Sequence, residues 1–362
     1  EAKGAIVNAA TWKDYTFYYV TLPKGIDDKD LYLAIELHCD MMTDPVIPDE
    51  EIGFPFDLDD TNIKEKRERH VVIEEIRMRK DQPWTKVYNN CNFNMYSSHP
   101  YKRDVIGTAQ IISQVTRDEV MNYYKTFYTP NNMVTIVVGD FDEEKVLEFI
   151  EKHFDFGDRK NCKLPNHKID SPTQKTITIE EISQVNSGYL MLGWICDKAS
   201  SMKNSAMMSM LSIILGDGTS SRLYQHLVEN NKDRIFTYAD SEHYQFKDGD
   251  NFFVQANFKP EKKEEAINLV KLELEKFLTD EITDEEFLKA QKKVKTGQAA
   301  TAETVSDIAD MIGTYFTVLG DLNLMETTVD VINSITKDDL KECARKYLNI
   351  NNAVISILMP DN

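Results

Sequence analysis

The sequence predicts an α+β protein built as two similar lobes in tandem. Three observations lead to this fold class: strand-sized apolar runs alternate with amphipathic helices, one stretch lacks any periodicity, and the C-terminal part repeats an earlier one. The aperiodic stretch, residues 156–174, holds one glycine and two prolines and is the predicted linker. We therefore predict a first lobe at residues 1–155 and a second lobe at residues 175–362.

The repeat is the strongest of these observations. Residues 112–133 align without gaps on residues 332–353, at a constant offset of 220 positions. Thr116 falls on Thr336, and each is followed three positions later by an acidic residue, which is the capping box that begins a helix. Both copies then enter a β-rich run. Ungapped similarity over this length indicates a duplicated structural unit.

The upstream parts of the two copies align at a different offset. Thr43-Asp44 matches Thr279-Asp280, an offset of 236 positions. The two offsets differ by 16 positions, so the first copy carries about that many extra residues. The irregular segment 44–62 contains Gly, Pro and an acidic cluster, and we place most of the extra residues in this predicted exposed loop.

The expected elements follow from hydrophobic period and from turn residues. In the first lobe they are strands at 4–11, 15–22 and 133–138, the last of them buried, and helices at 28–42, 68–79, 116–127 and 142–154, with a short helix around Ile111. In the second lobe they are strands at 176–181, 188–195, 234–244, 251–258 and 353–358, and helices at 200–215, 219–231, 262–278, 284–296, 299–319 and 336–347.

The second copy opens with two strands and two helices, residues 176–231, that have no counterpart in the first copy. We therefore expect roughly 50–60 residues of the first lobe to precede Glu1. A sheet without those strands and helices would leave a large apolar face exposed. The absent part is expected upstream in the natural polypeptide or in another chain.

Composition excludes several classes of function. The net charge of −19 argues against nucleic acid, whose phosphates would be repelled. No apolar run approaches the ~18 residues of a membrane span. The five cysteines are scattered, with no C-x-x-C pair, which indicates reduced thiols and a cytoplasmic location.

One helix carries a pair of carboxylates. Glu68 and Glu75 are seven positions apart and therefore point to the same side of a helix. Such a pair could hold a metal or a substrate, or it could be a solvated stripe. With Ile63 placed over Leu288, the repeat puts Lys293 and Ala300 at the two positions. The pair is confined to one copy, which favours a function over a structural role.

Several segments together carry a family resemblance. They are Asn8-Ala9-Ala10-Thr11, Asp40-Met41-Met42, Glu68 to Arg77, His99-Pro100-Tyr101, Thr129 to Met133, Gly139-Asp140-Phe141 and Ser220 to Gln225. In this order the chain resembles the pitrilysin/insulinase family of zinc peptidases, the inverted zincins. It is most similar to their short prokaryotic two-lobe members and to the mitochondrial processing peptidases. The resemblance implies a mainly antiparallel sheet covered by helices in each lobe, with the first lobe N-terminally incomplete.

The resemblance also implies site residues. The family binds Zn²⁺ through H-x-x-E-H and a distal glutamate, which aligns with Glu75. Glu68 aligns with a glutamate that orients the ligands, a supporting catalytic role. The seven histidines include no two that are four apart, so both histidine ligands would come from the absent N-terminal segment. Asn8, Ala9 and Ala10 resemble the edge strand that pairs with the substrate backbone, although an ordinary interior strand is the alternative.

The implied function is a zinc-dependent endopeptidase that degrades or processes unfolded peptides in a chamber between lobes or subunits. Family partners carry an Arg-x₆-Tyr pair after a Ser-Ser-Arg-Leu motif, but here the Arg position is Val228. This difference implies a zinc-bearing subunit that forms a homo- or heterodimer with an Arg/Tyr-bearing partner. The alternative function is a non-catalytic structural or substrate-holding subunit of the same fold.

Overall fold

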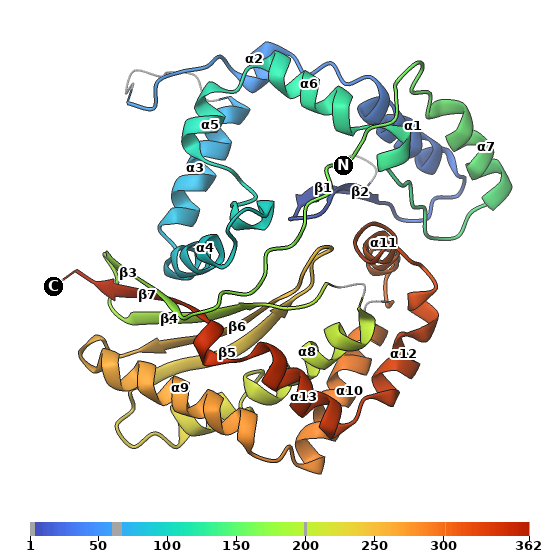
Figure 1. Ribbon diagram of the computed structural model, residues 1–362. Coiled ribbons are helices and arrows are strands. Elements are labelled where there is room, and N and C mark those ends of the chain that lie inside the picture. Colours follow the sequence, from blue (N-terminus) through green and yellow to red (C-terminus); the bar gives the residue numbers. More distant parts are fainter. Residues whose placement is uncertain (1–3, 60–66, 199–200, 301, 362) are drawn as a thin grey trace. The chain divides into compact units, whose positions relative to one another are not determined.

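The computed structural model describes residues 4–59, 67–198, 201–300 and 302–361 (Figure 1). These residues form two compact units. The first unit contains the described residues of Glu1–Met78, Val105–Asn166 and Ala302–Gly313, and the second contains those of Arg79–Asp104, His167–Thr301 and Thr314–Asn362. Each unit therefore includes a short segment from the other half of the chain. The two units are defined by contacts in space, whereas the lobes at residues 1–155 and 175–362 were defined by the repeat along the sequence. These lobe boundaries therefore remain a prediction.

The first unit has a small sheet and several helices. Strands β1 (Ile6–Thr11) and β2 (Thr16–Thr21) pair antiparallel, with Asn8 opposite Tyr19. The helices are α1 (Lys29–Thr43), α2 (Asp49–Ile52), α3 (Glu68–Lys80), α5 (Ala109–Gln114), α6 (Arg117–Phe127), α7 (Glu143–His153) and α11 (Val305–Thr314), of which α3 and α11 end just inside the second unit. Ile35 and Cys39 of α1 are buried against Val146 of α7.

The buried strand predicted at residues 133–138 is wrong. The segment forms no strand, and Val134 is 40% exposed. Its counterpart in the second copy is β7 (Val354–Pro360), which is paired on both sides. Among the described residues of the first unit, only β1 and β2 form a sheet, and they pair with each other. A β-rich run without a neighbouring strand has no partner for its backbone hydrogen bonds, so its propensity alone does not make a strand.

The second unit is built on a five-stranded sheet. Its strands are β3 (Ile177–Ser183), β4 (Gly188–Ile195), β5 (Phe236–Tyr244), β6 (Asn251–Phe258) and β7, in the order β3-β7-β4-β6-β5. Only β3 and β7 run parallel, and the other pairs are antiparallel. This arrangement confirms the predicted α+β class with a mainly antiparallel sheet.

Helices cover one face of this sheet (Figure 1). They are α8 (Met202–Leu215), α9 (Lys263–Thr279), α10 (Asp284–Ala300), α12 (Leu324–Ser334) and α13 (Lys337–Tyr347), together with a π-helical segment at Tyr224–Glu229. A second π-helical segment, Tyr315–Leu319, contacts α12, where the hydroxyls of Tyr315 and Thr328 are 2.9 Å apart. Leu190, Leu192 and Trp194 of β4 point into the core under these helices. The capping box predicted at Thr336 is present at the start of α13, as is the one at Thr116 before α6.

Helix α4 (Pro83–Met95) packs on the opposite face of the same sheet. Met191 and Ile195 of β4 pack in one core with Cys91 and Met95 of α4. A β-carbon at Gly193 would lie 2.6 Å from the sulfur of Met95 and 2.7 Å from that of Cys91, so only glycine allows this close approach. The sheet is thus buried on both faces, which explains why β4 is almost entirely apolar.

Candidate functional site

Helix α3 forms where the sequence predicted it, and it carries the predicted carboxylate pair. Glu68 and Glu75 are both exposed. Val71 and Met78, which share their side of the helix, are 56% and 69% exposed. An exposed helix face normally carries polar residues, so these two large apolar side chains make this face more apolar than is usual.

The opposite face of α3 is buried. Ile73 and Ile76 are each 2% exposed, and Arg69 continues this buried stripe one turn earlier. Glu74 lies elsewhere on the helix surface and accepts a hydrogen bond of 2.7 Å from Arg77. The helix is therefore oriented by its buried stripe, and Glu68 and Glu75 are turned away from it.

The described residues do not form a complete metal site. They contain no group of three or more His, Cys, Asp or Glu side chains that could hold a metal ion. Zinc sites in proteins use three or four such ligands, so the described part of this chain does not fit a zinc ion by itself. Glu75 can offer one oxygen ligand.

The predicted peptide-binding strand is β1. Asn8, Ala9 and Ala10 are exposed, and β1 pairs with β2 along one side. The side chain of Asn8 accepts a hydrogen bond of 2.8 Å from the backbone N–H of Ala9. Figure 1 shows β1 and α3 as separate elements of the first unit. Whether β1 binds a peptide remains a prediction.

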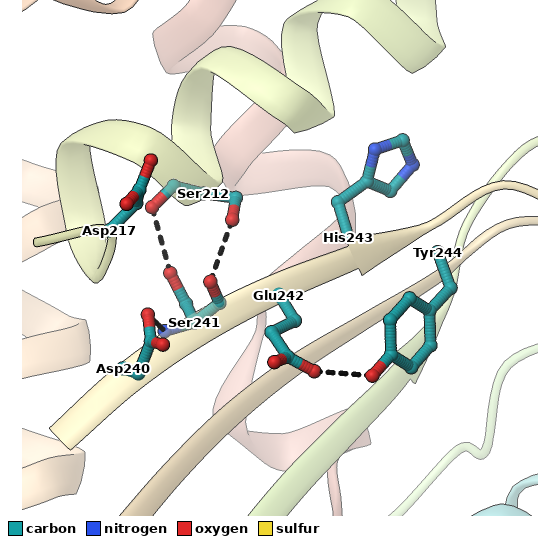
Figure 2. A pocket seen from close by; sticks show the side chains of 7 residues that line it. All are labelled: Ser212, Asp217, Asp240, Ser241, Glu242, His243 and Tyr244. Atoms are coloured by element: carbon teal, nitrogen blue, oxygen red, sulfur yellow. Dashed lines mark hydrogen bonds between the residues drawn. The ribbon is translucent and has the colours of Figure 1, made fainter. Parts of the chain in front are cut away.

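A pocket of about 360 Å³ lies beside the edge strand β5 in the second unit. Figure 2 shows the seven residues that line it, namely Ser212, Asp217, Asp240, Ser241, Glu242, His243 and Tyr244. Its carboxylates already have partners: Asp217 pairs with Lys293 at 2.6 Å, and Glu242 accepts a hydrogen bond from Tyr244. Sequence reasoning did not single out this pocket, and its acidic groups are occupied by contacts within the protein.

A chain of serine, histidine and aspartate lies next to this pocket. His243 contacts Ser209 through Nδ1 and Asp250 through Nε2, each at 3.0 Å. Asp250 also accepts hydrogen bonds from Ser205 Oγ at 2.7 Å and from the backbone N–H of Phe246 at 3.1 Å. Ser209 is not among the residues that line the pocket. The cluster joins α8 and β5 to Asp250, the residue immediately before β6.

His99, part of the family resemblance, is also a structural residue. It is buried, and its Nε2 lies 3.2 Å from Asp248. Asp170 holds the same loop by accepting hydrogen bonds from Ser97 Oγ and from the backbone N–H groups of Ser98 and His99, at 2.7, 3.0 and 2.8 Å. Burial by itself raises the pKa of Asp170, but these hydrogen bonds outweigh it and hold the pKa well below its usual value.

The Asp170 contacts predict a pH-dependent contribution to stability. Because the folded state lowers its pKa, Asp170 stabilises the fold above its unfolded pKa of ~3.9, and this contribution is lost as the pH falls toward the lower folded value. Asp170→Asn is therefore expected to lower the free energy of unfolding at pH 6, with a difference from wild type that shrinks between pH 4 and pH 2.5. Urea unfolding over this range measures it. A difference that stays constant with pH would contradict the assignment.

Among the described residues, no helix is long and apolar enough to cross a membrane. All five cysteines are free thiols, and four of them are buried.

Residues 114–294 match the model of the peptidase M16 inactive domain. The chain is 26% identical over 357 residues to an uncharacterized zinc protease of Streptomyces coelicolor. This alignment covers 96% of this chain and 72% of that protein.

Solved structures of proteases and of peptidase M16 domains also resemble this chain. A protease from Helicobacter pylori superposes with a TM-score of 0.83 at 26% identity, covering 99% of this chain and 82% of the other. A peptidase M16 inactive domain from Pseudomonas fluorescens has the same TM-score at 18% identity, covering 100% of this chain and 82% of the other, and this likeness shows the fold alone. The matched segment amounts to half of the sequence, and the chain belongs to the family of the peptidase M16 inactive domain.

Proposed function

We propose that this chain is the greater part of a zinc endopeptidase subunit that acts on unfolded peptides. In this proposal Glu75 is one of three protein ligands of the zinc ion, and Glu68 orients them. Both histidine ligands come from a further segment that completes the first lobe. The observation that carries the proposal is the exposed face of α3, on which both carboxylates lie beside Val71 and Met78.

A comparison between the two copies supports the proposal that a further segment covers helix α1 of the first unit. On α1, Leu37 is 59% exposed and Met41 is exposed as well. Their counterparts at the offset of 236 positions, Glu273 and Phe277 on α9, are buried. Part of that cover is the Tyr224–Glu229 segment, from which His226 binds Glu273 at 2.6 Å. The described residues of the first unit include no equivalent segment over Leu37 and Met41, and exposed apolar side chains of this kind favour burial.

The chemistry of the proposed centre follows from general zinc chemistry. Zinc with three protein ligands keeps a fourth position for water, whose pKa the metal lowers toward ~7. The residues of this chain would contribute one carboxylate ligand and a second carboxylate that orients the site. The exposed strand β1, with Asn8, Ala9 and Ala10, is the proposed place where a substrate backbone adds as a further strand.

The proposed assembly is a dimer. The chain lacks the Arg-x₆-Tyr pair after Ser220-Ser221-Arg222-Leu223, so we propose a family partner that supplies it. Arg222 itself forms an ion pair within the second unit, in which its Nε lies 2.6 Å from the carboxylate of Glu286. Inverted-zincin chemistry and a processing-peptidase-like heterodimer are parts of this proposal.

A non-catalytic subunit of the same fold is the second candidate. Two observations favour it: the matching family model describes an inactive domain, and the described residues hold no complete metal site. In that case the chain serves assembly or holds substrate, and Glu68 and Glu75 are a solvated stripe.

The experiment that separates the two candidates is a zinc determination. The complete polypeptide would be expressed from its natural gene and purified with any partner that accompanies it. About one zinc ion per dimer is expected for the endopeptidase. A metal-free protein after purification without chelators, which stays metal-free when zinc is added, would favour the non-catalytic subunit.

A further inference from the structure

Arg69 is a buried guanidinium on the inner face of α3, only 3% exposed. Its Nη1 donates to the carbonyl of Ile112 at 2.7 Å. Its Nη2 donates to the carbonyls of Val115 at 2.6 Å and Gly53 at 2.8 Å. Ile112 and Val115 lie in the last turn of α5 and just beyond it, where helix carbonyls lack intrahelical partners and favour a cation. One side chain therefore joins α3 to two other segments.

This interaction is unusual in its electrostatics. No carboxylate pairs with Arg69 among the contacts that the structure describes, and its buried Nε has no hydrogen-bond partner there. Burying a charge is costly unless it is fully paired, so a residue chosen only for packing would not be an arginine. The planar fork of the guanidinium, which can meet three carbonyls from fixed directions, accounts for the choice.

The second copy provides an internal control. In the register that aligns Glu68 with Lys293, Arg69 falls on Val294 of α10, which is partly buried against the main core. Simple apolar packing thus suffices for the twin helix. The arginine occurs in the copy that carries Glu68 and Glu75, and one of its acceptors, Gly53, lies in the extra loop of that copy.

The loop that Arg69 binds is itself held in place. Gly53 has a φ of +85°, which only glycine adopts readily. Phe56 stacks on the ring of His70 with centroids 4.5 Å apart, and its backbone N–H donates to the carbonyl of Ser113 at 3.1 Å. The segment from Gly53 to Phe56 therefore contacts both α3 and α5, and Gly53 supplies one of the three acceptors of Arg69.

We propose that Arg69 is a positioning residue, which locks the rotation of α3 about its axis by binding the end of α5 and the Gly53 turn, and thereby sets the direction of Glu68 and Glu75. The inference rests on the proposed zinc function of Glu75. It adds that the direction of the Glu75 carboxylate depends on the Arg69 guanidinium and its three carbonyl acceptors on the far side of α3. In the second copy, Val294 stands at the position of Arg69.

The test uses the complete polypeptide in wild-type form and three variants. Arg69→Met removes the donors while keeping a long side chain, Arg69→Lys keeps the charge without the fork, and Arg77→Met removes an exposed arginine of the same helix. Zinc affinity is measured by competition with a chelator, well below the unfolding temperature of each variant. Loss of Arg69 is expected to weaken zinc binding about 10- to 100-fold, as for other groups that orient ligands.

The expected order of zinc affinity is wild type and Arg77→Met highest, Arg69→Lys intermediate and Arg69→Met lowest. If Arg69→Met does not fold, Arg69→Lys decides, with an affinity below that of Arg77→Met as the supporting result. A folded Arg69→Met that binds zinc as tightly as wild type would overturn the positioning role alone. A wild-type protein that binds no added zinc would overturn the proposed function as well, so the two failures are distinguishable.

Discussion

Replacing Glu75 by glutamine in the complete polypeptide is expected to abolish peptide hydrolysis while leaving the unfolding temperature unchanged. Glutamine keeps the size of the side chain and removes the negative charge that a zinc ligand provides. Because Glu75 is exposed, the exchange should alter stability by no more than about 0.5 kcal/mol. Activity should fall by more than about 100-fold, beyond the typical effect of a residue that only orients a ligand.

Glu74→Gln is the matched control. Glu74 is the sequence neighbour of Glu75 on the same helix, is also exposed, and forms a surface ion pair with Arg77. Exposed pairs of this kind contribute little, so Glu74→Gln should retain wild-type turnover and stability. Turnover of a fluorogenic peptide and thermal unfolding are measured for both variants. Equal activities of Glu74→Gln and Glu75→Gln would refute the assignment of Glu75.

Replacing Asp250 by alanine is expected to destabilise the second unit strongly. Asp250 accepts hydrogen bonds from Ser205, from His243 and from the backbone of Phe246, and it is 1% exposed. Alanine leaves these donors buried without an acceptor. Removing one partner from a buried polar network lowers the free energy of unfolding by about 3–5 kcal/mol. This is a large part of the stability of a typical domain.

Asp330→Ala is the control for this prediction, because Asp330 is an exposed aspartate on α12. Surface substitutions of this type usually change stability by less than about 0.5 kcal/mol. Urea unfolding followed by tryptophan fluorescence compares the two variants, since Trp194 is buried in the core of the same unit. If Asp250→Ala unfolded at the same urea concentration as Asp330→Ala, the buried hydrogen bonds of Asp250 would not contribute to the free energy of unfolding as predicted.

Much of the fold could be predicted from local sequence. The capping boxes at Thr116 and Thr336 begin helices because side chain and backbone satisfy each other within four residues. Strands β4 and β6 were predictable because their apolar runs are the length of a strand and end at turn residues. Glu68 and Glu75 could be placed on one face because helix geometry alone sets that relation.

Other features depended on contacts between distant parts of the chain. Helix α4 contains four asparagines, which have low helix propensity, so no helix was predicted there. It forms because Val87, Cys91 and Met95 recur at helical spacing and pack on the sheet of the second unit. Residues 133–138 failed to form the predicted strand for the opposite reason, since neither β1 nor β2, the described strands of the first unit, pairs with them.

The sequence by itself determined the duplication, most of the helices and strands, and the carboxylate pair on α3, because these depend on periods and caps within a few residues. Only the tertiary structure decided which face of α3 is buried and that Arg69 binds three carbonyls from two other segments. A buried arginine and an exposed one have the same local sequence signature. What distinguishes them is the set of acceptors that the folded chain brings to the guanidinium.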